Sequence, residues 1–161
     1  MEIVLRCLDD TYALARFLAE ALRHCPTVRA LLLRGPLGSG KTTFACALVR
    51  ALPNGQEAET GSPSFTLCNQ YPTQPPVLHC DLYRGTAMPP DELLEELANS
   101  AVLTIVEWAE YLPLSEIPNE FLDISFNPCD KNTLLTVRGH GSGADALLQT
   151  LVNATRKWTA P

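Results

Sequence analysis

A glycine-rich segment, Gly35-Pro-Leu-Gly-Ser-Gly-Lys-Thr42, constrains the fold more than any other part of this 161-residue chain. It matches the pattern GxxxxGK[ST] at every fixed position. The apolar run Ala30–Leu33 precedes it, and apolar side chains recur at helical spacing from the lysine to Leu52. A buried strand, a glycine-rich turn and a helix in this order are typical of a phosphate-binding loop in an α/β protein.

The residue types in this segment explain how it would hold phosphate. Glycines let backbone N–H groups turn toward phosphate oxygens, and the N-terminus of the following helix adds a partial positive charge. The Lys41 ammonium would reach the β- and γ-phosphates, and the Thr42 hydroxyl would bind Mg²⁺. A plain strand-to-helix turn is the alternative interpretation. The candidate nucleotide-binding residues here are Gly35, Pro36, Leu37, Gly38, Ser39, Gly40, Lys41, Thr42 and Thr43.

Glu107 is the candidate acidic partner of the metal. It closes the apolar run 101–107, which reads as a central strand. In open α/β sheets, ligands gather at the carboxyl ends of the strands, where the phosphate-binding loop also lies. We therefore expect Thr42 and Glu107 to share the Mg²⁺ site, the alternative being a solvated carboxylate at a strand end.

Asp81 is the second candidate carboxylate. On a strand over residues 77–83, His79, Asp81 and Tyr83 would share one side, and the apolar residues between them would face the core. Asp81 could then position a water near the γ-phosphate, or simply belong to a hydrogen-bonded polar edge. We assign His79 no role. The hydroxyl-rich segment 60–64 is either a loop that senses the γ-phosphate or only a connection.

The rest of the chain predicts an α/β layer fold, because strands alternate with helices. We expect a helix over 11–22 with its N-cap at Asp9 or Asp10, and a last helix that begins with a capping box at Ser142–Asp145. A single domain would span 1–155, with a flexible tail at 156–161. Further expected elements are strands over 65–71, 121–126 and 134–138, and a short helix over 91–97.

Composition narrows the functional classes. The net charge of -6 argues against unaided binding to nucleic acid, which needs clustered Lys and Arg. No apolar run approaches the ~20 residues that cross a bilayer, and no signal peptide is recognisable, so we expect a cytoplasmic protein. The six cysteines are irregularly spaced and form no CxxC pair. We expect mostly buried thiols in a reducing compartment.

Four ordered segments, GPLGSGKTTF, SPSFTL, HCDLYR and VEW, together resemble the TsaE family, also called YjeE. The resemblance covers about residues 9 to 138. This family is the ATPase component of the bacterial machinery that makes threonylcarbamoyladenosine in tRNA. Ser39 stands where the family usually has Ala, and Ser64 where it usually has Thr. Both residues are small, and Ser64 keeps the hydroxyl, so neither departure breaks the chemistry.

The resemblance implies a P-loop NTPase-like, three-layer fold with a mostly parallel central sheet. It implies that the chain binds and hydrolyses ATP with Mg²⁺, and supports turnover of a complex with TsaD-like and TsaB-like proteins, which would handle the tRNA. Because the sequence shows no certain arginine for the phosphates, we expect slow hydrolysis by the isolated protein and acceleration by these partners. Lys41 and Thr42 would serve the phosphates and the metal, Glu107 the metal, and Asp81 the hydrolysis. The segment Ser62 to Phe65 would act as a switch-like loop, and Trp108 would lie near the nucleotide.

Two other classes share the phosphate-binding loop. A small-molecule or nucleotide kinase usually carries an arginine-rich lid, but Arg84 and Arg138 are the only arginines between Arg50 and Arg156. A nucleotide-gated binding module with little catalysis of its own overlaps with the ATPase hypothesis. A GTPase is disfavoured because the chain has no NKxD motif.

Overall fold

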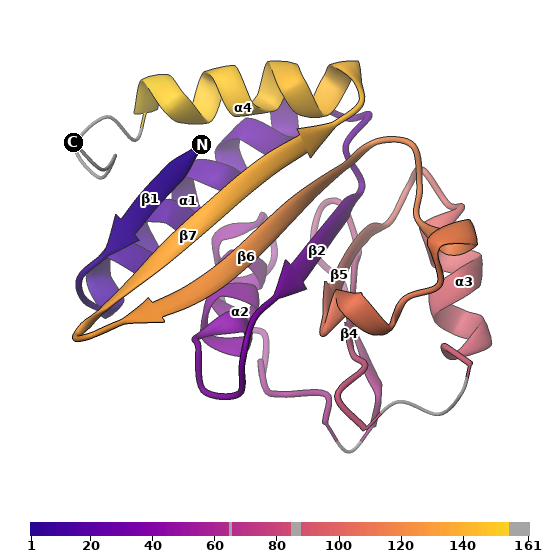
Figure 1. Cartoon of the computed structure of the whole chain (residues 1–161). Helices are drawn as coiled ribbons and strands as arrows, with labels where there is room; N and C mark the ends of the chain where they lie inside the picture. The colour runs from indigo at the N-terminus through magenta and orange to yellow at the C-terminus, as the bar shows by residue number, and fades with distance from the viewer. Residues whose placement is uncertain (65, 85–87, 155–161) are drawn as a thin grey trace.

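The computed structural model of this protein describes residues 1–64, 66–84 and 88–154, which form one mixed seven-stranded sheet with helices on both faces (Figure 1). The α/β fold expected from the sequence is confirmed. The strands are β1 (Glu2–Leu5), β2 (Ala30–Arg34), β3 (Cys68–Tyr71), β4 (Val77–Asp81), β5 (Leu103–Glu107), β6 (Phe121–Cys129) and β7 (Asn132–His140). The helices are α1 (Leu8–His24), α2 (Lys41–Ala51), α3 (Asp91–Leu97) and α4 (Ser142–Ala154), with short 3₁₀ helices η1 (Ala109–Tyr111) and η2 (Leu114–Glu116).

The parallel part of the sheet lies at its centre. The strand order is β1-β7-β6-β2-β5-β4-β3, and the pairs β6–β2, β2–β5 and β5–β4 are parallel. The outer pairs, β1–β7, β7–β6 and β4–β3, are antiparallel. A parallel strand is covered on both faces and therefore reads as a continuous apolar run, as β2 does. The strands that carry the sequence motifs are thus parallel neighbours.

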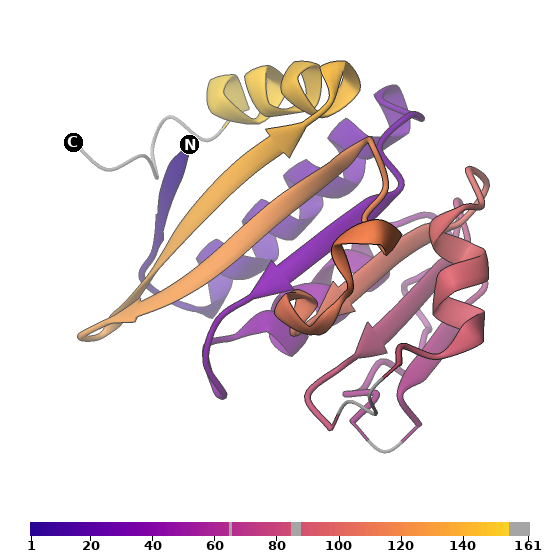
Figure 2. The ribbon, with the colours of Figure 1, turned by 45° about the vertical axis from the view of Figure 1, so that its right-hand side comes forward.

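Three layers result from this arrangement. Helices α1, α2 and α4 cover one face, and both ribbon views show α1 and α2 behind the sheet (Figures 1 and 2). Helix α3 and η1 pack on the opposite face. Side chains alternate along β2, so Leu31 and Leu33 join the first core and Leu32 joins the second. Central strands buried on both sides hold their carboxyl ends in fixed positions.

The N-terminus differs from the expectation. Strand β1, which the sequence analysis did not anticipate, pairs with β7. Helix α1 begins at Leu8 after Cys7, so Asp9 and Asp10 lie in its first turn instead of capping it. The Asp10 carboxylate accepts a hydrogen bond from the Arg6 amide at 2.9 Å. Acidic side chains in a first turn still stabilise a helix through its dipole.

The expected capping box of the last helix is wrong. The Asp145 amide donates to the carbonyl of Gly141 and not to the Ser142 hydroxyl. Glu120, which precedes β6, accepts hydrogen bonds from the amides of Gly143 and Ala144 at 3.0 and 3.1 Å. A carboxylate distant in sequence therefore satisfies these N-terminal donors of α4.

The remaining boundaries are close to those expected. Strand β3 begins at Cys68, later than the expected residue 65, and β4 ends at Asp81. Phe65 and the predicted tail at 156–161 lie outside the described residues. Within the described part of the chain, every helix is too short or too polar to traverse a lipid bilayer.

Candidate functional site

The glycine-rich loop connects the carboxyl end of β2 to the first residue of α2. Gly35 has φ 133°, and a Cβ there would lie 2.5 Å from the carbonyl oxygen of Phe126. Gly40, the residue that precedes α2, has φ 100° and makes no side-chain cap. Both positions require glycine, because L side chains rarely adopt this conformation. The amides at the start of α2 are thus left without a side-chain cap and suit an anion.

Lys41, the first residue of α2, is held inside the loop. Its Nζ donates to the carbonyl oxygens of Gly35 at 2.7 Å and Pro36 at 2.9 Å. It also lies 4.1 Å from the ring centroid of Trp108, in a cation–π contact. Burial lowers the pKa of Lys41 below its ordinary value, and nearby carboxylates, Glu107 first, partly oppose this. A positive charge is therefore held where phosphate oxygens would bind.

Thr42 and Glu107 meet as the sequence predicts. The Thr42 hydroxyl donates to Glu107 Oε2 at 2.8 Å. Glu107 is the last residue of β5 and lies beside Leu33 of β2, so the parallel pairing of the two strands brings the carboxylate to the loop. Its side chain is 2% exposed. These two oxygen-bearing side chains come from segments 65 residues apart in the sequence.

Asp81 ends β4 directly beside Glu107 of β5. Its Oδ2 accepts a hydrogen bond from the Ser64 hydroxyl at 2.6 Å, and its Oδ1 accepts one from the Tyr83 amide at 2.9 Å. The hydroxyls of Ser62 and Ser64 lie 2.6 Å apart. The loop that follows α2 is thus tied through its serines to the second carboxylate.

These side chains line one cavity of about 200 Å³. Gly35 and Pro36 of the candidate residues do not line it, and their carbonyl oxygens hold Lys41 instead. Its lining residues are Leu37, Gly38, Ser39, Gly40, Lys41, Thr42, Thr43, Ser62, Ser64, Asp81, Tyr83, Glu107 and Trp108.

The donor set fits Mg²⁺ bound together with phosphate. Among the described residues no group of three or more His, Cys, Asp or Glu could hold a metal alone. Mg²⁺ in nucleotide sites takes only one or two protein oxygens and completes its shell with phosphate oxygens and water. The Thr42 hydroxyl and the Glu107 carboxylate are ligands of this kind.

Sequence reasoning missed three features next to the site. The Tyr83 and Trp108 rings lie 4.6 Å apart, and Tyr111 follows at 6.3 Å from Trp108. His79, which does not line the cavity, lies 2.8 Å from Glu107 through its Nε2. A second cavity, of about 260 Å³, shares Gly38, Ser39, Gly40 and Thr43 with the first. All three features depend on tertiary packing, since even the Tyr83–Trp108 contact joins residues that follow different strands.

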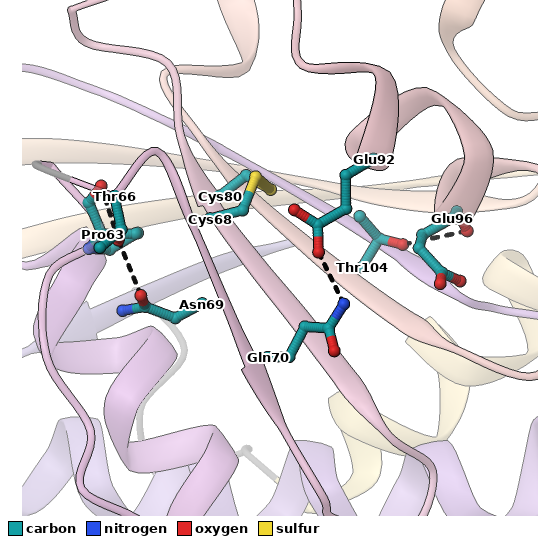
Figure 3. The surroundings of a disulfide bond; sticks show 9 residues. All are labelled: Pro63, Thr66, Cys68, Asn69, Gln70, Cys80, Glu92, Glu96 and Thr104. Carbon is teal, nitrogen blue, oxygen red and sulfur yellow. Dashed lines mark hydrogen bonds between the residues drawn. A yellow bond between two sulfur atoms is a disulfide. The ribbon is translucent and has the colours of Figure 1, made fainter.

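The expectation of mostly buried thiols is wrong. Cys68 of β3 and Cys80 of β4 form a disulfide, and the two residues are direct partners in the antiparallel pair (Figure 3). Hydrogen bonds between Gln70 and Glu92 and between Thr66 and Asn69 flank it. Cys7 and Cys129 are exposed, and Cys25 and Cys46 are partly buried. The spacing of the cysteines alone carried no sign of this pairing.

The chain matches a known family over most of its length. The family model described as "Threonylcarbamoyl adenosine biosynthesis protein TsaE" matches residues 5–135. The chain belongs to the TsaE family. The matched range contains the loop, Asp81, Glu107 and Trp108. The resemblance carried by the four sequence motifs is therefore confirmed, and with it the family's role in threonylcarbamoyladenosine biosynthesis.

Individual TsaE proteins support the same assignment. The chain is 40% identical over 110 residues to the protein named tRNA threonylcarbamoyladenosine biosynthesis protein TsaE of Aquifex aeolicus, covering 68% of this chain and 77% of that one. The protein of the same name from Rickettsia bellii is 32% identical over 139 residues, covering 80% and 92%. The crystal structure of Bacillus subtilis YdiB shares the fold, with a TM-score of 0.72, 24% identity and coverage of 96% and 95%.

Proposed function

We propose that this TsaE-family protein is a Mg²⁺-dependent ATPase of the tRNA threonylcarbamoyladenosine machinery. One observation carries the proposal: Lys41, the Thr42–Glu107 pair and the Ser64–Asp81 pair line one cavity at the carboxyl end of the sheet. A lysine, a hydroxyl with a carboxylate, and a further carboxylate are the groups that phosphoanhydride hydrolysis needs.

Each of these groups would have its own role in ATP binding and hydrolysis. The loop amides and the α2 N-terminus would hold the β- and γ-phosphates, and Lys41 would exchange the carbonyls of Gly35 and Pro36 for phosphate oxygens. Thr42 and Glu107 would hold Mg²⁺, which supplies charge neutralisation when bound. Asp81 would orient the attacking water, with its carboxylate held by Ser64. We propose that all nine loop residues from Gly35 to Thr43 take part in nucleotide binding, Gly35 and Pro36 through their contacts with Lys41.

The second cavity suits the adenosine end of ATP. It adjoins the first along the loop, and its walls combine apolar Leu8 and Phe126 with polar Thr11 and Lys131. Most of its lining residues are polar or glycine, so Leu8 and Phe126 would contact the base while the polar side chains would fix its orientation. With the base there, Thr43 would lie between the base and the phosphates, because it lines both cavities.

Partners would complete the ATPase. No arginine lines the first cavity among the described residues. An arginine supplied by another protein can raise hydrolysis about 10³–10⁵-fold in related enzymes. We infer slow hydrolysis by the isolated chain and stimulation by TsaD-like and TsaB-like proteins. The net charge of -6 favours tRNA contact through these partners and not directly.

The decisive test is ATP hydrolysis by the purified protein, alone and with the TsaD-like and TsaB-like proteins. Stimulated hydrolysis that Lys41→Ala abolishes would support the proposal, because this change removes the charge that faces the phosphates. Normal multiple-turnover formation of threonylcarbamoyladenosine in a reconstituted system without this protein would contradict it. Transfer of phosphate to a small acceptor would indicate a kinase instead.

A further inference from the structure

Glu107 is a buried carboxylate with one partner on each oxygen. Oε2 accepts from the Thr42 hydroxyl at 2.8 Å, and Oε1 lies 2.8 Å from His79 Nε2. His79 is 0% exposed and Glu107 is 2% exposed. A carboxylate out of contact with water is unfavourable unless hydrogen bonds compensate. Each of these two contacts therefore helps to fix the position of the Glu107 carboxylate.

The position of His79 on β4 places its side chain beside Glu107. Cys80 and Leu78 of β4 face the α3 side with the second core, so His79 faces the α2 side with Glu107. His79 pairs with Ile105, and Glu107 lies two residues further along β5. The imidazole thus approaches the carboxylate diagonally across the β4–β5 pair, and it contacts Oε1 while Thr42 contacts Oε2.

The contact with Glu107 defines which ring nitrogen of His79 carries the hydrogen. A carboxylate oxygen only accepts, so the short contact requires the hydrogen to be on Nε2. Nδ1 is buried and has no hydrogen-bond partner among the described residues, and a lone pair is cheaper to leave there than an N–H. His79 does not line the cavity that holds Lys41 and Asp81. It therefore acts on the site only through Glu107.

We propose that His79 is a positioning residue that fixes the Glu107 carboxylate for Mg²⁺–nucleotide binding, an inference that rests on the proposed ATPase function. By holding Oε1, the imidazole leaves Oε2 directed at Thr42, the other oxygen-bearing side chain of the metal site. Groups that orient a metal's ligands in this way typically affect metal affinity about 10–100-fold when removed.

The test compares Mg²⁺-linked nucleotide binding in two variants. A fluorescent ATP analogue is titrated in EDTA, and Mg²⁺ is then titrated into the protein–analogue mixture. In His79→Leu, which removes the donor and keeps an apolar side chain, the apparent Mg²⁺ dissociation constant rises about 10–100-fold. Affinity in EDTA does not change. In His79→Gln, whose amide can donate from nearly the same place, Mg²⁺ affinity stays close to that of the wild type.

Controls separate positioning from packing. Val77→Ala removes two buried methyl groups two residues earlier on the same face of β4, so it lowers the melting temperature without changing Mg²⁺ affinity. In a Glu107→Gln background, His79→Leu has no further effect on Mg²⁺ affinity, because the two changes act on one contact. If His79→Leu does not fold, His79→Asn, whose amide is too short to reach Oε1, must show the same loss.

Three outcomes would count against these ideas in distinguishable ways. Wild-type Mg²⁺ affinity in His79→Leu would overturn the positioning role. The same loss in His79→Gln as in His79→Leu would also overturn it, because the donor would then not matter. A wild-type protein whose analogue binding does not respond to Mg²⁺ would overturn the proposed ATPase function itself, and the positioning role with it.

Discussion

The Ser64 hydroxyl donates a 2.6 Å hydrogen bond to Asp81 Oδ2, which ties the loop after α2 to the carboxyl end of β4. Asp81 Oδ1 is occupied at the same time by the Tyr83 amide. The carboxylate is therefore held in place by a loop on one side and its own chain on the other. A loop that orders around a γ-phosphate would move this carboxylate through the serine.

Asp81→Asn is expected to separate binding from hydrolysis. The amide keeps the size of the side chain but loses the charge that would orient the water, so hydrolysis should fall by about 10²-fold or more. ATP binding should remain, because Lys41 and the loop amides are unchanged. Phosphate release and binding of a fluorescent ATP analogue measure the two properties. Ser64→Ala is the matched variant and should slow hydrolysis less, and an Asp81→Asn protein with wild-type hydrolysis would contradict the assigned role.

Local sequence patterns predicted the parts of the site that lie within one segment. The loop and α2 follow from a glycine pattern and a helical repeat. Glu107 could be assigned because it closes an apolar run, and parallel strands bring such ends to one edge. The alternation along β4 predicted that Leu78 and Cys80 face the core on the side opposite Asp81, and both lie in the core on the α3 side.

The features that sequence reasoning missed all depend on contacts between distant segments. The partner that caps α4 is Glu120, whose carboxylate has no spacing relation to Gly143. The Cys68–Cys80 bond follows from the register of β3 on β4, which no local pattern encodes. His79 was given no role because a lone histidine is weak evidence until its neighbour is known.

Leu8→Glu is expected to impair binding of the nucleoside more than binding of phosphate. Leu8 begins α1, is 59% exposed and lines the second cavity. A carboxylate there would replace an apolar wall and repel phosphate oxygens only weakly, so we expect ATP affinity to fall about tenfold, or ~1.4 kcal/mol. Affinity for inorganic tripolyphosphate should be nearly unchanged, and calorimetry measures both.

Leu114→Glu is the control for this charge change. Leu114 is 88% exposed and lines neither cavity. The variant should bind ATP like the wild type. Equal loss of ATP and tripolyphosphate affinity in Leu8→Glu would place the base elsewhere.

Trp108 is expected to report on nucleotide binding. Its ring contacts the Lys41 ammonium at 4.1 Å, and in the proposed ATPase this lysine would turn toward phosphate when ATP binds. The environment of the ring then changes, because a cation–π contact is lost or altered. In a Trp158→Phe variant, which leaves Trp108 as the sole tryptophan, emission should change saturably with ATP. Trp108→Phe should lack this signal, and a flat titration in Trp158→Phe would argue against movement of Lys41.

Cys46 is expected to react more slowly than the exposed thiols. Burial is the largest cause that raises the pKa of Cys46 above its ordinary value of 9.0. A raised pKa keeps the thiol protonated to higher pH, and the thiolate is the reactive form. At pH 8, iodoacetamide should therefore label Cys7 and Cys129 first, as peptide mass spectrometry would show. Labelling of Cys46 should accelerate as the pH rises beyond 9, and equal rates at pH 8 would contradict the raised pKa.

Removal of the Cys68–Cys80 bond is expected to lower the free energy of unfolding. The bond joins residues 12 apart in sequence. Closing a loop of this size lowers the entropy of the unfolded chain, which raises the free energy of unfolding by about 3 kcal/mol in the loop-entropy description. Urea unfolding of the wild type with and without dithiothreitol measures the difference. A Cys68→Ser/Cys80→Ser protein should match the reduced wild type, and Cys7→Ser/Cys129→Ser, which changes only exposed thiols, should match the oxidised one. Unfolding curves that do not respond to dithiothreitol would show that the bond contributes nothing.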